Sequence, residues 1–225
     1  MDDYLSEKEQ WESLKAWVRE NGLWVLAGVA LAAAGISGWR WYQGHVNATA
    51  ARASAQYEQM MQAFARNDTT AAFVALGALQ RDYPGSPYVD QAKLAAARSY
   101  VESNQLDKAA SELQALAAQS RDKDLAMVAR LRLARVQIAQ KQADQAISTL
   151  QAMQPGAFAA RYHEVMGDAY YAKGDKANAL KEYLTARAAD LGSGTGAGEG
   201  LELKIADLAP TSNMPVAPPT AATAK

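Results

Sequence analysis

The chain has 225 residues, with 23 Lys and Arg, 24 Asp and Glu, and no Cys, which gives a formal net charge of −1. It contains no basic run of five or more residues, so the clustered positive surface typical of nucleic-acid-binding proteins is not indicated, and we predict no nucleic-acid partner. Alanine is abundant and β-branched residues are sparse outside one apolar stretch, which favours helix over sheet.

Residues 1–20 predict a short amphipathic helix on the cytosolic side. Ser6 and Glu9 have the spacing of a capping box. One face is apolar and carries two tryptophans, and we expect the helix to stop at Asn21 and Gly22. This face is either a docking surface for a cytosolic partner, centred on Trp11 and Trp17, or a surface that lies among lipid headgroups. Tryptophan is common at membrane interfaces, which favours the second interpretation.

Residues 21–42 predict a single transmembrane helix in a lipid bilayer. From Asn21 to Trp39 no side chain is ionisable, and about 20 such residues are enough to cross the hydrocarbon core. A cleaved signal peptide is the alternative. The acidic leader, the length of the apolar run and the interfacial belt from Trp39 to Tyr42 argue against it.

Flanking charges indicate the orientation of this helix. Lys8, Lys15 and Arg19 precede it, whereas Arg40 and Arg52 follow it. Because positive residues are retained in the cytosol, this bias favours a cytosolic N-terminus. In a Gram-negative cell the chain would then be a single-pass inner-membrane protein with a periplasmic C-terminal domain.

Residues 46–190 show an internal repeat. Alanines recur at spacings of 37, 37 and 33 residues, at Ala72, Ala109, Ala146 and Ala179. Four residues after each alanine comes a large residue: Leu76, Leu113, Leu150 and Tyr183. Five residues before each alanine, in the expected turn, stand Asn67, Asn104, Lys141 and Gly174. Twelve residues before each, in the expected first helix, stand Met60, Ala97, Ala134 and Gly167. This pattern resembles the tetratricopeptide repeat, in which pairs of antiparallel helices stack and small residues lie where helices cross. It predicts an all-α fold, a tetratricopeptide-repeat-like solenoid after the membrane helix.

The same register predicts a protein-binding groove lined by the first helix of each pair. Its residues are Tyr57, Met61, Phe64, Leu94, Arg98, Val101, Leu131, Arg135, Ile138, Glu164, Asp168 and Tyr171. An apolar groove with two arginines and two carboxylates suits an extended or helical peptide. The alternative is that several of these side chains pack against neighbouring helices or the tail, because a helical apolar stripe is usually core.

The end of the chain predicts three short segments. Residues 191–200 are glycine-dense and lack the lysine and flanking strand of a phosphate-binding loop, so we predict a linker. Residues 201–208 predict a helix that caps the last repeat. Residues 209–225 hold four prolines and no core-forming pattern, so we predict a disordered tail.

The sequence contains no pattern that predicts catalysis. There is no cysteine nucleophile and no serine in a nucleophile-elbow pattern, and His45 and His163 stand in unrelated segments. We therefore predict no enzymatic activity, no metal and no cofactor.

Four short motifs carry a family resemblance. Glu20 to Gly22 precedes the apolar stretch, Gly38 to Tyr42 follows it, and Leu131 to Gln137 is followed by Lys141 to Ala146. In this order and spacing they resemble the ancillary SecYEG translocon subunit family.

That resemblance implies association with the SecYEG translocon, with a membrane-anchored prolyl-isomerase-like periplasmic chaperone and with unfolded client polypeptides. Two alternatives stay open. One is a scaffold for enzymes of envelope assembly, and the other is a membrane signalling receptor with a cytosolic docking helix.

Overall fold

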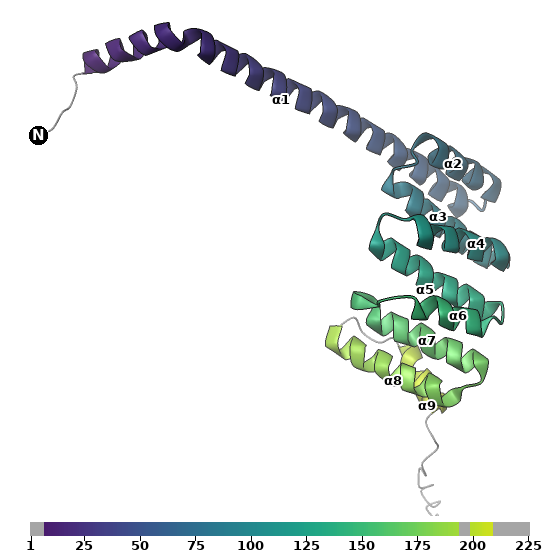
Figure 1. Cartoon of the computed structure of the whole chain (residues 1–225). Coiled ribbons are helices and arrows are strands. Elements are labelled where there is room, and N and C mark those ends of the chain that lie inside the picture. The colour runs from purple at the N-terminus through teal and green to yellow at the C-terminus, as the bar shows by residue number, and fades with distance from the viewer. Residues whose placement is uncertain (1–6, 194–198, 209–225) are drawn as a thin grey trace, which may run out of the picture. The chain divides into compact units, whose positions relative to one another are not determined.

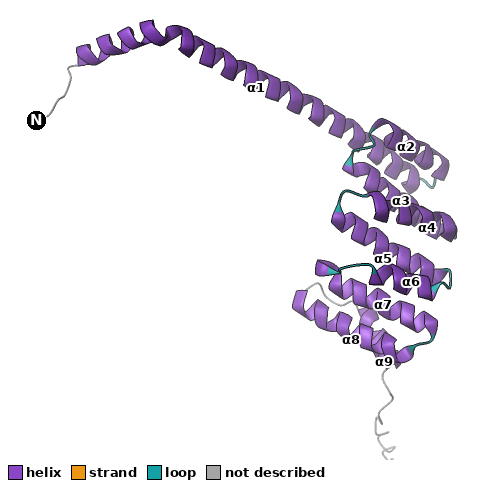
Figure 2. Cartoon of the chain, in the orientation of Figure 1, coloured by secondary structure: helices purple, strands orange, loops and turns teal. Residues whose placement is uncertain are grey.

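The structure, a computed structural model, describes residues 7–193 and 199–208. Within these ranges every regular element is a helix, and Figure 2 accordingly shows helices joined by short loops with no strand in the described part. The prediction of an all-α fold is confirmed. The chain divides into two compact units, residues 1–56 and 57–225.

The described part of the first unit is a single helix, α1, which spans Glu7–Ala65 and so continues into the second unit. The predicted stop at Asn21 and Gly22 is wrong, because α1 runs through both residues. Glycine costs only about 1 kcal/mol in a helix interior, and the Asn21 side-chain amide donates a hydrogen bond to the Trp17 carbonyl oxygen at 3.0 Å. Between residues 42 and 46, likewise, no turn separates the apolar stretch from the repeats.

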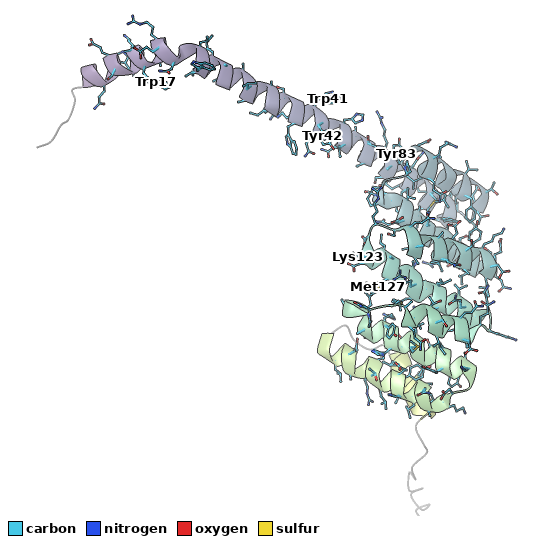
Figure 3. The ribbon with its side chains drawn as sticks, viewed as in Figure 1. Trp17, Trp41, Tyr42, Tyr83, Lys123 and Met127 are labelled. Carbon is cyan, nitrogen blue, oxygen red and sulfur yellow. The ribbon has the colours of Figure 1, made fainter. Side chains whose placement is uncertain are left out.

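Helix α1 is, among the described residues, the one helix long and apolar enough to cross a membrane, judged by length and composition. Its large apolar side chains are exposed along the apolar stretch; Leu23 is 79% exposed and Leu31 is 74% exposed. Figure 3 shows Trp17, Trp41 and Tyr42 projecting outward from α1. Among the described residues, an apolar stretch whose side chains are exposed in this way is the pattern expected of a helix surrounded by lipid.

The second unit is a stack of antiparallel helix pairs (Figure 1). The first pair joins the end of α1 to α2 (Thr69–Asp82). The next pairs are α3 (Pro87–Glu102) with α4 (Leu106–Gln119), α5 (Lys123–Ala139) with α6 (Ala143–Gln151), and α7 (Ala159–Lys173) with α8 (Lys176–Ser193). A 3-10 turn, Gly156–Phe158, precedes α7, and α9 (Glu199–Leu208) packs against α8.

The predicted repeat register is confirmed residue by residue. All four repeat alanines are 0% exposed, at Ala72, Ala109, Ala146 and Ala179. The four turn residues all adopt left-handed backbone, with φ of 57° at Asn67, 56° at Asn104, 63° at Lys141 and 88° at Gly174. Asn and Gly tolerate this conformation, which a β-carbon otherwise makes costly. Each turn therefore reverses the chain by the same backbone geometry.

In the last three pairs the helix crossings are occupied by small residues of the first helices, whereas the first pair has the buried Met60 there. At Gly167 an added β-carbon would overlap the Tyr183 ring, so no larger residue fits between α7 and α8. Ala97 and Ala134 hold the equivalent positions and are 2% and 0% exposed. Aliphatic residues fill the remaining space in continuous clusters, one of which joins Leu94 on α3, Leu113 on α4 and residues of α5.

In the last two repeats, polar contacts occupy the position at which the tetratricopeptide consensus places a tryptophan. In the last two repeats the residues there are Arg130 and His163. Arg130 donates a long hydrogen bond of 3.5 Å to the Ala117 carbonyl oxygen, and His163 Nδ1 lies 2.7 Å from Glu182 Oε2. These contacts link α5 to α4 and α7 to α8.

The helices near the end of the chain extend into the predicted linker, residues 191–200. Helix α8 continues to Ser193 and α9 begins at Glu199, so both helices include residues that the sequence assigned to the linker. Residues 194–198 and the predicted disordered tail, 209–225, lie outside the described residues. Leu201 and Ile205 of α9 are buried in one cluster with Ala179, Tyr183 and Ala186 of α8.

Candidate functional site

The twelve predicted groove residues lie on the first helices of the four pairs, but they do not form one surface. Leu94 is 8% exposed and Leu131 is 4% exposed, and both belong to the hydrophobic core. Ile138 packs against the same core cluster as Leu131. These three side chains stabilise the stack. The sequence register assigned them to a groove, but in the folded stack they face the neighbouring helices and pack there. They present little or no surface to a partner.

The first repeat supplies an aromatic region. The Tyr57 ring lies 5.7 Å from the Tyr88 ring, and Phe64 makes an edge contact with Phe73 at 5.8 Å. These contacts join the end of α1 to α2 and α3 and leave both predicted residues only half-buried. Met61, between them, is 39% exposed and offers a flexible apolar contact.

The second and third repeats form a pocket. Its volume is about 260 Å³, and three of its residues are predicted groove residues: Arg98, Val101 and Arg135. The remaining cation, Arg132, was missed by the sequence analysis, although it lies three residues before Arg135 and thus on the same helix face. Apolar side chains from α3, α4 and α5 complete the wall, namely Ala97, Leu106, Leu113, Val136 and Ala139.

The side chains that line this pocket carry net positive charge. Burial of part of the side chain, then the charges of Arg135 and Arg98, lower the pKa of Arg132. Arg98 pairs with Glu102 at 2.7 Å, while Arg135 lies 3.9 Å from Glu164. Three guanidinium groups therefore surround one apolar cavity, with one close carboxylate among their partners.

The fourth repeat supplies the predicted acidic end, and α9 covers it. Lys204 of α9 lies 3.0 Å from Glu164 and 2.7 Å from Asp168. The Tyr171 hydroxyl donates to Asp207 at 3.3 Å, and the Tyr183 hydroxyl donates to Asp168 at 2.9 Å. The two predicted carboxylates are thus engaged by the protein's own groups.

These contacts shift the pKa of their members. Burial lowers the pKa of Lys204, but the hydrogen bonds and charges of Asp168 and Glu164 outweigh it, so its pKa is raised. Burial and the neighbouring charge of Asp168 raise the pKa of Tyr183. Lys204, placed between the two carboxylates, therefore binds α9 to α7. Of the three predicted groove residues in this repeat, only Tyr171 is exposed, at 46%.

The pocket between α3, α4 and α5 offers apolar and arginine side chains for non-covalent contacts. In residues 7–193 and 199–208, no group of three or more His, Cys, Asp or Glu side chains is placed to hold a metal ion.

Known proteins resemble this chain over most of its length. The sequence matches the family of tetratricopeptide repeat-like domains over residues 15–210. A protein of Escherichia coli K12 named ancillary SecYEG translocon subunit is 32% identical over 181 residues, which cover 80% of this chain and 86% of the relative. The chain belongs to the ancillary SecYEG translocon subunit family.

Further ancillary SecYEG translocon subunits show the same extent of similarity. Those of Aggregatibacter actinomycetemcomitans and Haemophilus influenzae are each 31% identical over 183 residues, covering 81% of this chain and 89% of each relative. The family resemblance predicted from the short motifs is confirmed, and so is the repeat-like nature of the domain.

Proposed function

We propose that this chain is a membrane-anchored adaptor of the Sec translocon whose repeat unit binds partner proteins or polypeptides that emerge from the channel. The relatives are named as translocon subunits, which supports the association. The observation that carries the binding role is the pocket between α3, α4 and α5, where apolar walls and three arginines remain accessible. Its action requires no bond to be made or broken, so we propose a non-enzymatic role.

The proposed location is the bacterial inner membrane. Helix α1 is the candidate span, and the flanking lysines and arginines favour a cytosolic N-terminus and a periplasmic repeat unit. The proposed partners are the SecYEG translocon, a membrane-anchored prolyl-isomerase-like chaperone and unfolded clients. In such an assembly the anchor would raise the local concentration of the repeat unit near the channel, so that weak contacts suffice.

Native copurification from detergent-solubilised membranes tests the association. The tagged chain is expected to retain translocon subunits and the chaperone. Recovery of cell-wall synthesis enzymes in their place would favour the scaffold, and recovery of a cytosolic regulator that is lost on deletion of residues 2–18 would favour the receptor.

Site-specific photocrosslinking tests the binding face. A photoreactive residue at Val101 or Tyr171, which are 42% and 46% exposed on first helices, is expected to give adducts with partner or client chains. Val74 on α2 is 69% exposed and provides the matched control, because it lies on a second helix and does not line the pocket between α3, α4 and α5. Equal adducts from Val74 and Val101 would contradict a binding role for the first helices.

A further inference from the structure

The pocket between α3, α4 and α5 has a charge pattern that its apolar walls alone do not explain. Arg98 on α3 and Arg135 on α5 are 37 residues apart, which is the repeat spacing, so they hold equivalent positions in consecutive pairs. Arg132 lies one turn earlier on α5. In the first repeat the equivalent residue is Met61, and in the fourth it is Asp168, so this pair of arginines is confined to the middle of the stack.

The positive charge of the pocket is incompletely compensated by the residues that the structure describes. In the part of the chain that the structure describes, Arg132 has no hydrogen bond or ion pair. Glu164 is 3.9 Å from Arg135, but it is shared with Arg161 at 3.5 Å and with Lys204 at 3.0 Å. Among the described residues, only Glu102, at 2.7 Å from Arg98, forms a close pair at this site. Like charges gathered beside an apolar wall favour an incoming anion, as the lowered pKa of Arg132 also indicates.

The size of the pocket restricts its occupant. Its volume of about 260 Å³ lies below the roughly 300–1,000 Å³ typical of small-molecule sites, and suits one or two side chains of a peptide. Arginine forms bidentate hydrogen bonds with carboxylates, and the fixed geometry of these bonds favours a planar carboxylate over other groups.

We infer that this pocket binds a peptide segment in which one carboxylate side chain is flanked by apolar residues, with Arg132 and Arg135 holding the carboxylate. This inference rests on the proposed function and names the class of polypeptide that the site selects. The apolar neighbours of the carboxylate contact Val101, Leu106 and Ala139. Arg98 contributes charge at the opposite wall, while it remains paired with Glu102.

Binding of two matched peptides to the full-length chain in detergent tests the inference. One peptide contains Ala, Leu, Phe and Ser, is blocked at both ends, and carries a single Glu at its centre; the other has Gln there. A neutral environment-sensitive dye reports binding. We expect the Glu peptide to bind about five- to tenfold more tightly, the size of effect that charge-assisted hydrogen bonds give in a partly exposed site.

Two variants of the chain locate the effect. Arg132→Gln is expected to abolish the difference between the two peptides. Arg121→Gln removes the same charge from the segment before α5, at a residue that does not line the pocket, and is expected to preserve the difference. Equal effects of the two variants would overturn the inference, and thermal unfolding of both variants controls for loss of fold. Raising the salt concentration provides a second measurement, because it should weaken the Glu peptide selectively.

The remaining outcomes separate this inference from the proposed function. Tight binding of both peptides without discrimination overturns the inference and leaves the adaptor role intact. No binding of either peptide counts against both. If dihexanoyl phosphatidylglycerol displaces the Glu peptide from the native chain, and binds more tightly than the peptide in an Arg132-dependent way, the pocket is a lipid site and the inference is wrong.

Discussion

The backbone of α7 approaches the Tyr183 ring at Gly167, and the ring is held in place by the hydrogen bond from its hydroxyl to Asp168 at 2.9 Å. The same helix-crossing position holds Ala97 and Ala134 in the preceding repeats, where a β-carbon is accommodated. The aromatic residue on α8 therefore requires glycine on α7, and the two positions form one packing unit.

The Gly167→Ala substitution is expected to lower the free energy of unfolding by about 1–3 kcal/mol, because the added carbon overlaps a ring that cannot move freely. Thermal unfolding followed by circular dichroism measures it. Gly77→Ala on α2 is the matched control, since a β-carbon there meets no atom within 4 Å. This substitution also replaces a glycine, which destabilises a helix, by alanine. A loss of stability at Gly77 equal to that at Gly167 would contradict the packing argument.

Lys141 is the residue whose type agrees least with its turn conformation. It has φ of 63°, where Asn67 and Asn104 serve in the earlier repeats and Gly174 in the last. Lys141→Gly is expected to stabilise the chain by about 0.5–1 kcal/mol, because relief of the left-handed strain exceeds the added entropy of the unfolded state. Gly174→Ala should act in the opposite direction. Denaturant unfolding measures the free energy of unfolding of both variants. A loss of stability in Lys141→Gly would show that the left-handed backbone at Lys141 is not strained.

At the scale of helices, α9 completes the stack by covering the last pair. Leu201 and Ile205 bury an apolar face, and Lys204 places its ammonium between Glu164 and Asp168. A terminal repeat needs such a cover, because its outer apolar surface has no further pair to pack against.

The Lys204→Met substitution is expected to cost about 1 kcal/mol, a value that allows for solvent screening of a side chain that is 34% exposed. The folded-state pKa of Lys204 is raised, so the stability it contributes is fully present below its unfolded pKa of about 10.4 and is lost as pH rises through the folded value. The difference in melting temperature between native chain and variant should thus stay constant from neutral pH to about pH 10 and shrink above it.

The control for that experiment is Lys181→Met on α8, whose exposed side chain should leave stability unchanged at neutral pH. If both methionine variants melt together at every pH, Lys204 does not hold α9 in place.

For the whole molecule, the proposed anchor makes a testable difference to where the chain is found. Val29→Arg places a charge near the centre of the apolar stretch of α1, at a cost of about 2.5–3.5 kcal/mol for insertion. The variant is expected to appear in the soluble fraction after carbonate extraction. Val74→Arg, at an exposed site on α2, should remain with the membrane like the native chain. Retention of the Val29 variant would exclude α1 as the span.

Much of the fold could be predicted because its signals are local. The repeat period, the buried alanines and the left-handed turns each follow from residue types at fixed separations along the chain, and Ala146, Asn104 and Gly174 all have the predicted roles. The expected stop at Asn21 was wrong because a single Asn–Gly pair opposes helix weakly, and the apolar residues on both sides favour its continuation.

The candidate site was predicted only in part, because its members are selected by contacts between distant segments. By itself, the sequence determined the helical class, the register of the repeats and the family, since these depend on spacing and composition. Only the tertiary structure decided that Leu94 and Leu131 are core, that Arg132 joins Arg98 and Arg135 at one pocket, and that Lys204 covers Glu164. The last contact joins residues 40 positions apart, and no pattern of local spacing determines which face of a stacked helix such a partner will cover.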